Sequence, residues 1–365
     1  MTPSGQTAIG IIGLGNIGQY HANQLRSLGT ELPVTIGGGM DIDRTARDRF
    51  TESFGVTTYE DATTLYDAVD AVIITTPNRF HEQYAVGALE AGLDVLIEKP
   101  IAHTIESAQR VRETAAESDG DCMVGFHNRF SSSVQVLKEY HQAGRFGELT
   151  HIDANYIRRR GVPGRGTWFT SEADAGGGAL IDIGAHAIDL ALYLLDFPTV
   201  SEVTGVTRSE FGGRPDYTHL EMWGDHGDGP FDVDDSASAF IRCAQNRTIS
   251  LDVAWATNRP PTNEFIVTGT EAGARLDLSD GTLTLFESSP AGSPHFADTE
   301  ITTRDENPHR NEQRYFVEEI RSDSPLTMNT VEEGLSVQRV MDAIYRSSDR
   351  AGAVPIEMEP LSTAD

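Results

Sequence analysis

The stretch Thr7-Ala-Ile-Gly-Ile-Ile-Gly13-Leu-Gly15-Asn-Ile-Gly18 predicts the fold of the N-terminal part of the chain. Its first six residues form a short, mostly apolar segment, as in a buried strand. A segment with the apolar periodicity of a helix follows and stops at Gly29. The three glycines between them allow a tight turn and close approach of a ligand to the backbone. An anion would then lie at the N-terminus of the helix. This strand–loop–helix context, more than the glycine pattern alone, predicts a dinucleotide site.

Strands and helices alternate as far as Phe126, which predicts a parallel sheet with helices on both faces. After Val200 β patterns dominate with few helices between them, which predicts a mostly antiparallel sheet. We expect an α/β protein with two domains, 1–126 and 127–365. Two long stretches, 212–235 and 288–311, are polar and are expected to be loops.

A second stretch, Gly176-Gly-Gly-Ala-Leu-Ile-Asp182-Ile-Gly-Ala-His186, contains an acid and an imidazole. An apolar run with helical periodicity follows it, so Asp182 and His186 are expected one turn apart on one face of a helix. An acid that orients an imidazole is a general-base arrangement. Taken alone, the pair also fits a helix N-terminal acid and a core histidine.

The chain is strongly acidic. It has 365 residues, with 56 Asp and Glu against 28 Lys and Arg, and a formal net charge of −28. The only lysines are Lys99 and Lys138. Dispersed carboxylates with almost no lysine favour a protein of salt-rich cytoplasm, and an ordinary acidic protein is the alternative. The sequence has no basic stripe, which argues against nucleic acid as a partner.

Other features narrow the class of protein. The sequence has no apolar run of about 18 residues and no signal peptide at its start, so we expect a cytoplasmic protein without a membrane partner. Cys122 and Cys243 suit buried packing in a reducing compartment. The stretch 212–235, called the acidic loop below, contains four possible ligands whose spacing matches no metal-ligand pattern, so no metal is expected. These are His219, Asp225, His226 and Asp228.

Asp41 indicates the cofactor preference. It ends the next expected strand, at about the position, roughly 20 residues beyond the glycines, where an acid bonds the ribose 2′-hydroxyl. A carboxylate there repels a 2′-phosphate, which favours NAD. Arg44 lies close enough in sequence to keep NADP open.

Lys99 follows an expected strand within Glu98-Lys99-Pro100. Ligands of open parallel sheets bind at the carboxyl ends of the strands, so Lys99 should reach the nicotinamide region. Thr76-Pro77-Asn78 ends a neighbouring strand at the same edge. In a chain with so few lysines, this position disfavours a merely solvated surface cation.

Five motifs occur in a fixed order along the chain: Gly13-Leu-Gly15-Asn-Ile-Gly18-Gln-Tyr-His21, Thr76-Pro77-Asn78-Arg-Phe-His81, Glu98-Lys99-Pro100, Gly125-Phe-His-Asn-Arg129-Phe130 and Gly177-Gly178-x3-Asp182-x3-His186. In this order and spacing they resemble the glucose-fructose oxidoreductase/inositol dehydrogenase (Gfo/Idh/MocA) family. The resemblance covers nearly the whole chain. Glu-Lys-Pro together with Asp-x3-His is specific, whereas the glycine motif is not.

The resemblance implies a Rossmann domain joined to an α/β domain with a large, mostly antiparallel open sheet. In the family this sheet commonly forms the oligomer interface, which implies a homodimer or homotetramer. The family's catalytic lysine, aspartate and histidine fall on Lys99, Asp182 and His186. Pro100 matches a proline that is often preceded by a cis peptide bond.

The resemblance also implies ligand contacts. The loop 156–168 is similar to the substrate loop of sugar- and polyol-active members, although Arg165 stands where many have Trp, and His127 where many have Asn. The expected substrate contacts are Lys99, Tyr156, Arg158, Arg165, Trp168, Asp182 and His186. The expected NAD contacts, with NADP as the alternative, are Gly13, Gly15, Asn16, Ile17, Gly18, Asp41, Arg44, Thr76, Pro77, Asn78, His81, Glu98, Lys99 and His127.

Together these residues predict an NAD(P)-dependent oxidoreductase that oxidises a secondary or anomeric hydroxyl of a cyclic polyol or sugar, of inositol or aldose type. His186 would take the hydroxyl proton, Asp182 would hold the imidazole or bond a neighbouring hydroxyl, and Lys99 would stabilise the alkoxide. The arginines of the loop 156–168 leave an acidic sugar open as a substrate. The same set would serve an NAD-assisted glycoside hydrolase with transient oxidation. A non-catalytic sugar-sensing regulator on this fold would be expected to lack it.

Overall fold

The structure is a computed structural model that describes residues 5–220, 229–322 and 324–356. The chain forms two compact units, one of Met1–His127 with Asn307–Leu335, the other of Asn128–Glu306 with Ser336–Asp365. The expected boundary after residue 126 lies next to the first of these transitions. The expected two-range division differs for 307–335, which returns to the first unit because a helix there packs on the first helix of the chain.

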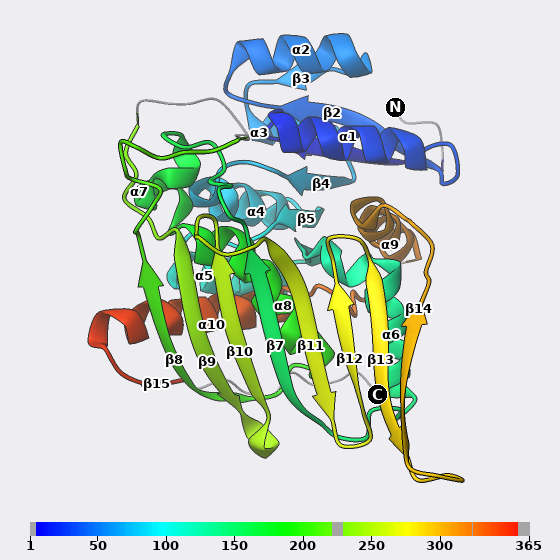
Figure 1. Ribbon diagram of the computed structural model, residues 1–365. Helices are drawn as coiled ribbons and strands as arrows, with labels where there is room; N and C mark the ends of the chain where they lie inside the picture. The colour runs from blue at the N-terminus through cyan, green and yellow to red at the C-terminus, as the bar shows by residue number, and fades with distance from the viewer. Residues whose placement is uncertain (1–4, 221–228, 323, 357–365) are drawn as a thin grey trace. The chain divides into compact units, whose positions relative to one another are not determined.

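The first unit contains a six-stranded parallel sheet in the order β3-β2-β1-β4-β5-β6 (Figure 1). Its strands are β1 (Thr7–Ile12), β2 (Val34–Met40), β3 (Thr58–Tyr59), β4 (Ala71–Ile74), β5 (Asp94–Glu98) and β6 (Cys122–Gly125). Its helices are α1 (Asn16–Leu28), α2 (Arg44–Phe54), α3 (Ala62–Tyr66), α4 (His81–Glu90), α5 (Ile105–Glu117) and α9 (Pro308–Ser322). The strand order reverses at β1, and ligands of such sheets bind at this switch point. This is the Rossmann arrangement that the alternating pattern predicts.

Local sequence sets the helix ends in this unit. The Asp43 side chain accepts from the backbone N–H of Thr45 at the start of α2, and Thr104 accepts from Ser107 at the start of α5. Asp and Thr side chains commonly cap helix N-termini in this way. α2 ends at Gly55, whose φ of 70° suits glycine. β3 has only two residues, too few to leave a sequence pattern.

The second unit is built on a nine-stranded sheet in the order β14-β13-β12-β11-β7-β10-β9-β8-β15. Only the β7–β10 pair is parallel, so the sheet is mostly antiparallel, as predicted. Its strands are β7 (Leu149–Ile157), β8 (Val200–Arg208), β9 (Ser236–Cys243), β10 (Thr248–Ala254), β11 (Thr262–Gly269), β12 (Ala272–Asp277), β13 (Thr282–Ser289), β14 (His295–Ile301) and β15 (Val354–Pro355). The helices are α6 (Ser132–Gln142), α7 (Glu172–Ala175), α8 (Ala185–Leu194) and α10 (Val331–Arg350), the last of which begins in the first unit.

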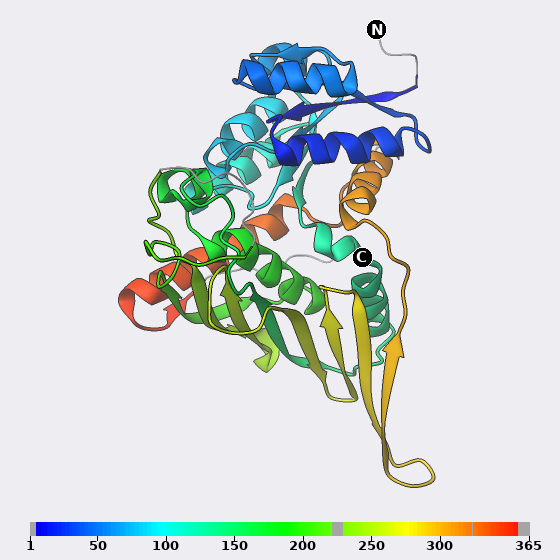
Figure 2. The ribbon, with the colours of Figure 1, turned by 45° about the horizontal axis from the view of Figure 1, so that its top comes forward.

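One face of this sheet is covered and the other is open. Figures 1 and 2 show α6, α8 and α10 behind the strands, while no helix of the described residues lies in front of them. Every residue of α8 is buried, which makes it the central helix of this core. Among the described helices, the run Glu172–Leu194 is long and apolar enough to cross a membrane, but 94% of its apolar window is buried inside the protein. A buried core helix has the same composition.

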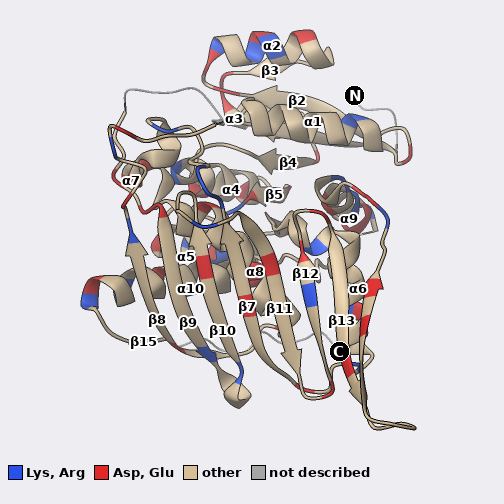
Figure 3. Ribbon diagram, in the orientation of Figure 1, with Lys and Arg blue, Asp and Glu red and all other residues tan. Residues whose placement is uncertain are grey.

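The sequence prediction was wrong for part of 288–311. This stretch contains β14, whose residues are all exposed or half-buried, so no apolar alternation marks the strand. The expected loop 212–235 falls partly on residues 221–228, which lie outside the described residues. Charged side chains are spread over elements of both units (Figure 3), in keeping with the dispersed acids of the sequence.

Candidate active site

The glycine loop between β1 and α1 has room for a ligand at one glycine only. A Cβ on Gly13, whose φ is 91°, would lie 2.9 Å from the backbone carbonyl carbon of Thr75. A Cβ on Gly18 would lie 2.0 Å from the backbone oxygen of Gly13. A Cβ on Gly15 would meet nothing within 4 Å. Gly15 is the N-cap of α1 and has no side-chain cap, so the space over the helix N-terminus fits a pyrophosphate. Asn16 and Ile17 form the first turn there.

The Asp41 carboxylate connects the glycine loop to α2. Its Oδ2 accepts from the Leu14 backbone N–H at 2.8 Å and its Oδ1 from the Asp43 N–H at 2.8 Å. Each carboxylate oxygen can accept more than one hydrogen bond, so the group still suits a ribose hydroxyl. Arg44 is 85% exposed and lies 3.7 Å from Asp48, so its guanidinium is a surface group.

The expected contacts after β4 and β5 are joined by one buried histidine. His81 is 1% exposed, and its ring nitrogens lie 2.9 Å from the Thr76 oxygen and 2.8 Å from the Pro100 oxygen. Burial lowers the pKa of this imidazole. Because its two ring nitrogens lie against carbonyl oxygens of both segments, the buried His81 ring packs between the two strand ends. Pro77 and Asn78 lie in the same loop, with Asn78 buried.

Glu98 lies beside Lys99 in a hydrogen-bonded chain of buried groups. Its Oε1 lies 2.7 Å from His21 Nε2, and its Oε2 accepts from the Lys99 backbone N–H at 3.2 Å. The Gln313 amide donates to His21 Nδ1 at 2.6 Å, so Nε2–H of His21 donates to Glu98. Burial raises the pKa of Glu98, but the hydrogen bond with His21 and the positive charge of Lys99 oppose this effect, and the pKa is lowered to about 2. Glu98 is therefore a carboxylate that steadies the Lys99 backbone.

The turn after Glu98 contains a cis peptide bond between Lys99 and Pro100, as the resemblance implies. Nearby, His127 stacks on His309 of α9 with ring centroids 3.6 Å apart. Burial lowers the pKa of His309 to about 4, so this imidazole is neutral near pH 7. The expected cofactor contact His127 thus belongs to an aromatic layer that the sequence analysis missed, because His309 lies far along the chain in an expected loop.

In the second unit, Asp182 lies in a π-helical turn, Leu180–Gly184, that leads into α8. This differs from the α-helical spacing expected for Asp182 and His186; π turns of this kind are frequent at functional sites. The Asp182 Oδ2 accepts from the indole N–H of Trp255 at 2.9 Å and lies 3.7 Å from Nη1 of Arg158. His186 follows in the first turn of α8 and is 7% exposed.

Because β7 and β10 pair in parallel, their carboxyl ends lie at the same end of the sheet, and Arg158 and Trp255 follow those ends. Tyr156 is opposite Val253, and the Arg158 backbone N–H donates to the Ala254 oxygen at 2.7 Å. Trp255 comes directly after β10 and is fully buried. The sequence analysis missed Trp255, although its position just after an expected strand is the same signal that identified Lys99 at the end of β5.

The arginines of the loop 156–168 have different partners. Arg158 lies 3.3 Å from the Tyr156 hydroxyl as well as near Asp182. The Arg165 guanidinium donates to the backbone oxygens of Gly212 at 2.7 Å and Arg214 at 2.8 Å. Trp168 stacks on Phe169. Arg165, an expected substrate contact, thus holds a neighbouring loop in place.

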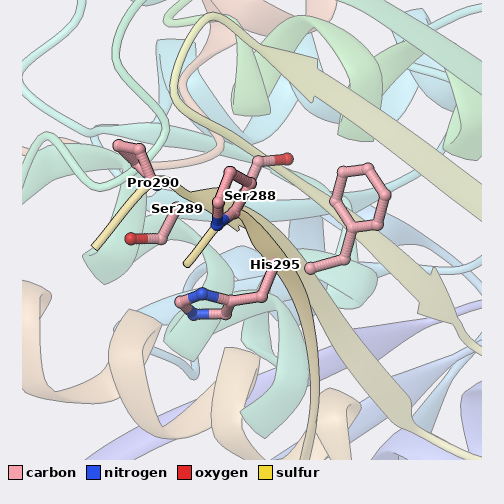
Figure 4. A pocket seen from close by; sticks show the side chains of 6 residues that line it. Ser288, Ser289, Pro290 and His295 are labelled. Carbon is pink, nitrogen blue, oxygen red and sulfur yellow. The ribbon is translucent and has the colours of Figure 1, made fainter. Parts of the chain in front are cut away.

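Two further features lie outside these residue sets. A pocket lined by the turn between β13 and β14 (Figure 4) contains none of the predicted site residues. Its lining residues are Ser288, Ser289, Pro290, Pro294, His295 and Phe296. No group of three or more possible metal ligands occurs among the described residues. Three of the acidic-loop residues weighed above, Asp225, His226 and Asp228, lie outside that part of the chain.

Comparison with known families agrees with this arrangement. Residues 7–126 match the family model described as oxidoreductase family, NAD-binding Rossmann fold, and residues 134–275 match the GFO/IDH/MocA C-terminal domain. D-glucoside 3-dehydrogenase of Escherichia coli is 30% identical over 79% of each chain. The chain belongs to the Gfo/Idh/MocA oxidoreductase family. It is an oxidoreductase whose first unit is an NAD-binding Rossmann domain.

Other members of the Gfo/Idh/MocA family differ in substrate. Glucose-6-phosphate 3-dehydrogenase of Bacillus subtilis is 31% identical over 53% of this chain and 55% of its own. Among solved structures, a levoglucosan dehydrogenase in complex with NADH and levoglucosan has a TM-score of 0.85, with 23% identity over 96% of this chain and 99% of that one. The latter similarity is one of fold.

Proposed function

We propose that this Gfo/Idh/MocA member oxidises a secondary or anomeric hydroxyl of a neutral cyclic polyol or sugar, with NAD as the hydride acceptor. The observation that carries the proposal is the Asp182 carboxylate, bonded by Trp255 and faced by Arg158, one turn before His186. Its partners suit a carboxylate that stays charged and orients polar groups. The names of the relatives, which act on a D-glucoside and on glucose 6-phosphate, agree with a carbohydrate substrate.

Each of the three chemical residues has a distinct role in the proposal. His186 accepts the proton of the reacting hydroxyl, because a neutral imidazole is a base near pH 7. Asp182 orients the imidazole or a neighbouring hydroxyl. Lys99 stabilises the developing alkoxide, an effect on the order of 3 kcal/mol for one well-placed donor in a dry site. Bound NAD supplies the acceptor for the hydride.

The contacts of the loop arginines favour a neutral substrate over a phosphorylated or acidic one. Arg165 donates to two backbone oxygens, and Arg160 donates to the Thr257 oxygen and to Asn258. Arg158 faces Asp182. A phosphate would have to use the remaining N–H groups of these guanidiniums or break existing hydrogen bonds, each worth about 1 kcal/mol. A sugar phosphate or sugar acid is the second candidate class, favoured by the number of arginines in this loop and by the name of the glucose-6-phosphate 3-dehydrogenase relative.

The cofactor preference in the proposal is NAD over NADP. Support comes from the Asp41 carboxylate at the end of β2, which would repel a 2′-phosphate, and from Arg44, whose guanidinium is exposed beside Asp48. Glu98 and the residues of the glycine loop are expected to lie along the same ligand.

We also propose a homodimer or homotetramer in a salt-rich cytoplasm. The open face of the nine-stranded sheet suits the first statement, and a net charge of −28 with two lysines suits the second. Sedimentation equilibrium tests the first. Thermal unfolding between low and molar KCl tests the second, because a protein adapted to salt should unfold at lower temperature when salt is removed.

The proposed reaction is tested by incubating the protein with NAD or NADP and a panel of methyl β-D-glucopyranoside, levoglucosan, myo-inositol, glucose 6-phosphate and gluconate at molar salt. Net formation of reduced nicotinamide with a neutral compound supports the proposal. Cleavage of the glycoside without net NADH would identify the NAD-assisted hydrolase instead. Saturable binding with neither product would identify a sensing protein.

A further inference from the structure

Asp234 bonds three successive residues of the turn that precedes Asp182. Its Oδ1 accepts from the Gly178 N–H at 2.8 Å and its Oδ2 from the Leu180 N–H at 2.9 Å, while its backbone oxygen accepts from Ala179 at 2.9 Å. The first N–H groups of a helical run have no partner within the helix. Here a carboxylate from a distant part of the chain satisfies them, in the manner of an N-cap.

Tyr345 of α10 completes this contact. Its hydroxyl donates to Oδ1 of Asp234 at 2.7 Å. A Cβ on Gly177 would lie 2.1 Å from the Tyr345 hydroxyl, and a Cβ on Gly178 would lie 1.8 Å from the backbone oxygen of Asp234. The two glycines therefore make this close approach possible, which explains part of the Gly-Gly-Gly run before Asp182.

The same segment also positions the partner of Asp182. The Asp182 backbone N–H donates to the Gly178 oxygen at 2.9 Å, so the turn held by Asp234 is the one on which Asp182 sits. The Trp255 backbone N–H donates to the oxygen of Asp235, the next residue, at 2.8 Å. Asp234 thus holds the turn of Asp182 through its side chain, whereas Asp235 contacts Trp255 through its backbone oxygen, which a side-chain substitution retains.

We propose that Asp234, supported by Tyr345, is a positioning residue that sets the geometry of Asp182 and His186 for proton transfer. The inference rests on the proposed function. Asp234 is buried and bonded by two N–H groups and one O–H, so it does not itself touch substrate. Burial raises its pKa, while the bonds from Leu180, Tyr345 and Gly178 oppose that effect. An uncharged side chain cannot accept all three donors equally well.

Asp235 offers a matched control. It is also buried, but its Oδ2 accepts from the N–H groups of Phe211 at 2.6 Å and Gly212 at 2.9 Å, in a different loop. Asp234→Asn and Asp235→Asn are therefore the same chemical change at adjacent buried positions. Both should destabilise the fold, but only the first alters the turn before Asp182.

The experiment compares these variants and Tyr345→Phe in the full-length protein, with the panel compounds and with NAD. We expect Asp234→Asn to lower kcat at least tenfold with the KM for NAD within about twofold, Tyr345→Phe to lower it less, and Asp235→Asn to leave it within about threefold. An unchanged kcat in folded Asp234→Asn, or equal losses in both Asn variants, would overturn the inference.

A second measurement does not depend on turnover. Hydrogen–deuterium exchange should speed up in the peptide 176–186 for Asp234→Asn, and around 209–214 for Asp235→Asn. Unaltered exchange in 176–186 would also overturn the inference. His186→Ala, assayed in parallel, separates the two levels of proposal. Full activity of His186→Ala contradicts the proposed function, whereas its loss beside an active Asp234→Asn contradicts only the positioning role.

Discussion

The indole N–H of Trp255 donates to Oδ2 of Asp182 across 2.9 Å, which joins the end of β10 to the π-helical turn before α8. Trp255 is fully buried, and Arg158 lies 3.7 Å from the same carboxylate oxygen. The neutral N–H of Trp255 and the Arg158 cation both face one oxygen of Asp182, so the orientation of this carboxylate is fixed.

Trp255→Phe should lower kcat/KM about 10- to 100-fold, because hydrogen bonds to charged groups contribute roughly 1.5–3 kcal/mol. Steady-state kinetics at saturating NAD, with thermal unfolding to account for lost packing, would measure it. Trp168→Phe is a suitable comparison, since its ring stacks on Phe169 instead. A loss no greater than that of Trp168→Phe would argue against a role for this bond.

Lys99→Ala and His186→Ala should each lower turnover by about 100-fold or more, because in the proposed mechanism each removes a group that acts on the reacting hydroxyl. NAD binding, followed by fluorescence titration, should change little. If both groups act on the same transition state, the double variant should lose less than the product of the two single losses. Undiminished turnover in both single variants would contradict the assignment.

Asp41→Ser should reduce the preference for NAD over NADP at least tenfold, since it removes the charge that repels a 2′-phosphate. It should also weaken binding of both cofactors somewhat, because the Asp41 carboxylate holds the Leu14 N–H of the glycine loop. The ratio of kcat/KM values with the two cofactors is the measurement. An unaltered ratio would remove the basis for assigning specificity to Asp41.

Gly15→Ala and Gly18→Ala should separate ligand binding from folding. The methyl group at Gly15 meets no protein atom within 4 Å and would occupy the space over the helix N-terminus, so we expect at least tenfold weaker NAD binding with Tm within a few degrees. The methyl group at Gly18 would lie 2.0 Å from the Gly13 oxygen, so we expect loss of stability. Calorimetry of unfolding and of NAD binding tests both statements.

Glu98→Gln should change how stability depends on acid. The pKa of Glu98 is lowered from its ordinary value of 4.5 to about 2, so its contribution is present above pH 4.5 and is lost as the pH falls toward 2. The shift corresponds to at most about 3 kcal/mol. The difference in unfolding free energy between the wild type and Glu98→Gln should therefore shrink across that window. A difference that stays constant with pH would show that the His21–Glu98 bond does not depend on the charge of Glu98.

The sequence predicts the Rossmann unit well, because buried parallel strands and glycine turns leave strong local signals. It predicts less of the second unit. β14 is exposed along its length and has no apolar period, so its sequence reads as a loop. Asp182 and His186 were identified by type and spacing, but the π turn depends on Asp234, which bonds Gly178 and Leu180 from far along the chain. Such distant partners leave no local pattern.

The same holds for the residues around Glu98. His21 and Glu98 both lie in motifs that the sequence identifies, yet Gln313 and His309 come from α9, whose residues were expected in the other domain. The loop 156–168 shows the converse, since Arg165 was an expected substrate contact while its hydrogen bonds go to backbone oxygens.

Because residues 307–335 belong to the first unit, that unit is completed late during synthesis. Gln313 must leave the ribosome before His21 can gain its second hydrogen-bond partner, and by then the whole nine-stranded sheet apart from β15 has been synthesised. The nucleotide-binding unit begins the chain but is among the last parts to be completed. During translation the glycine loop is therefore made long before the residues that complete the surroundings of Lys99.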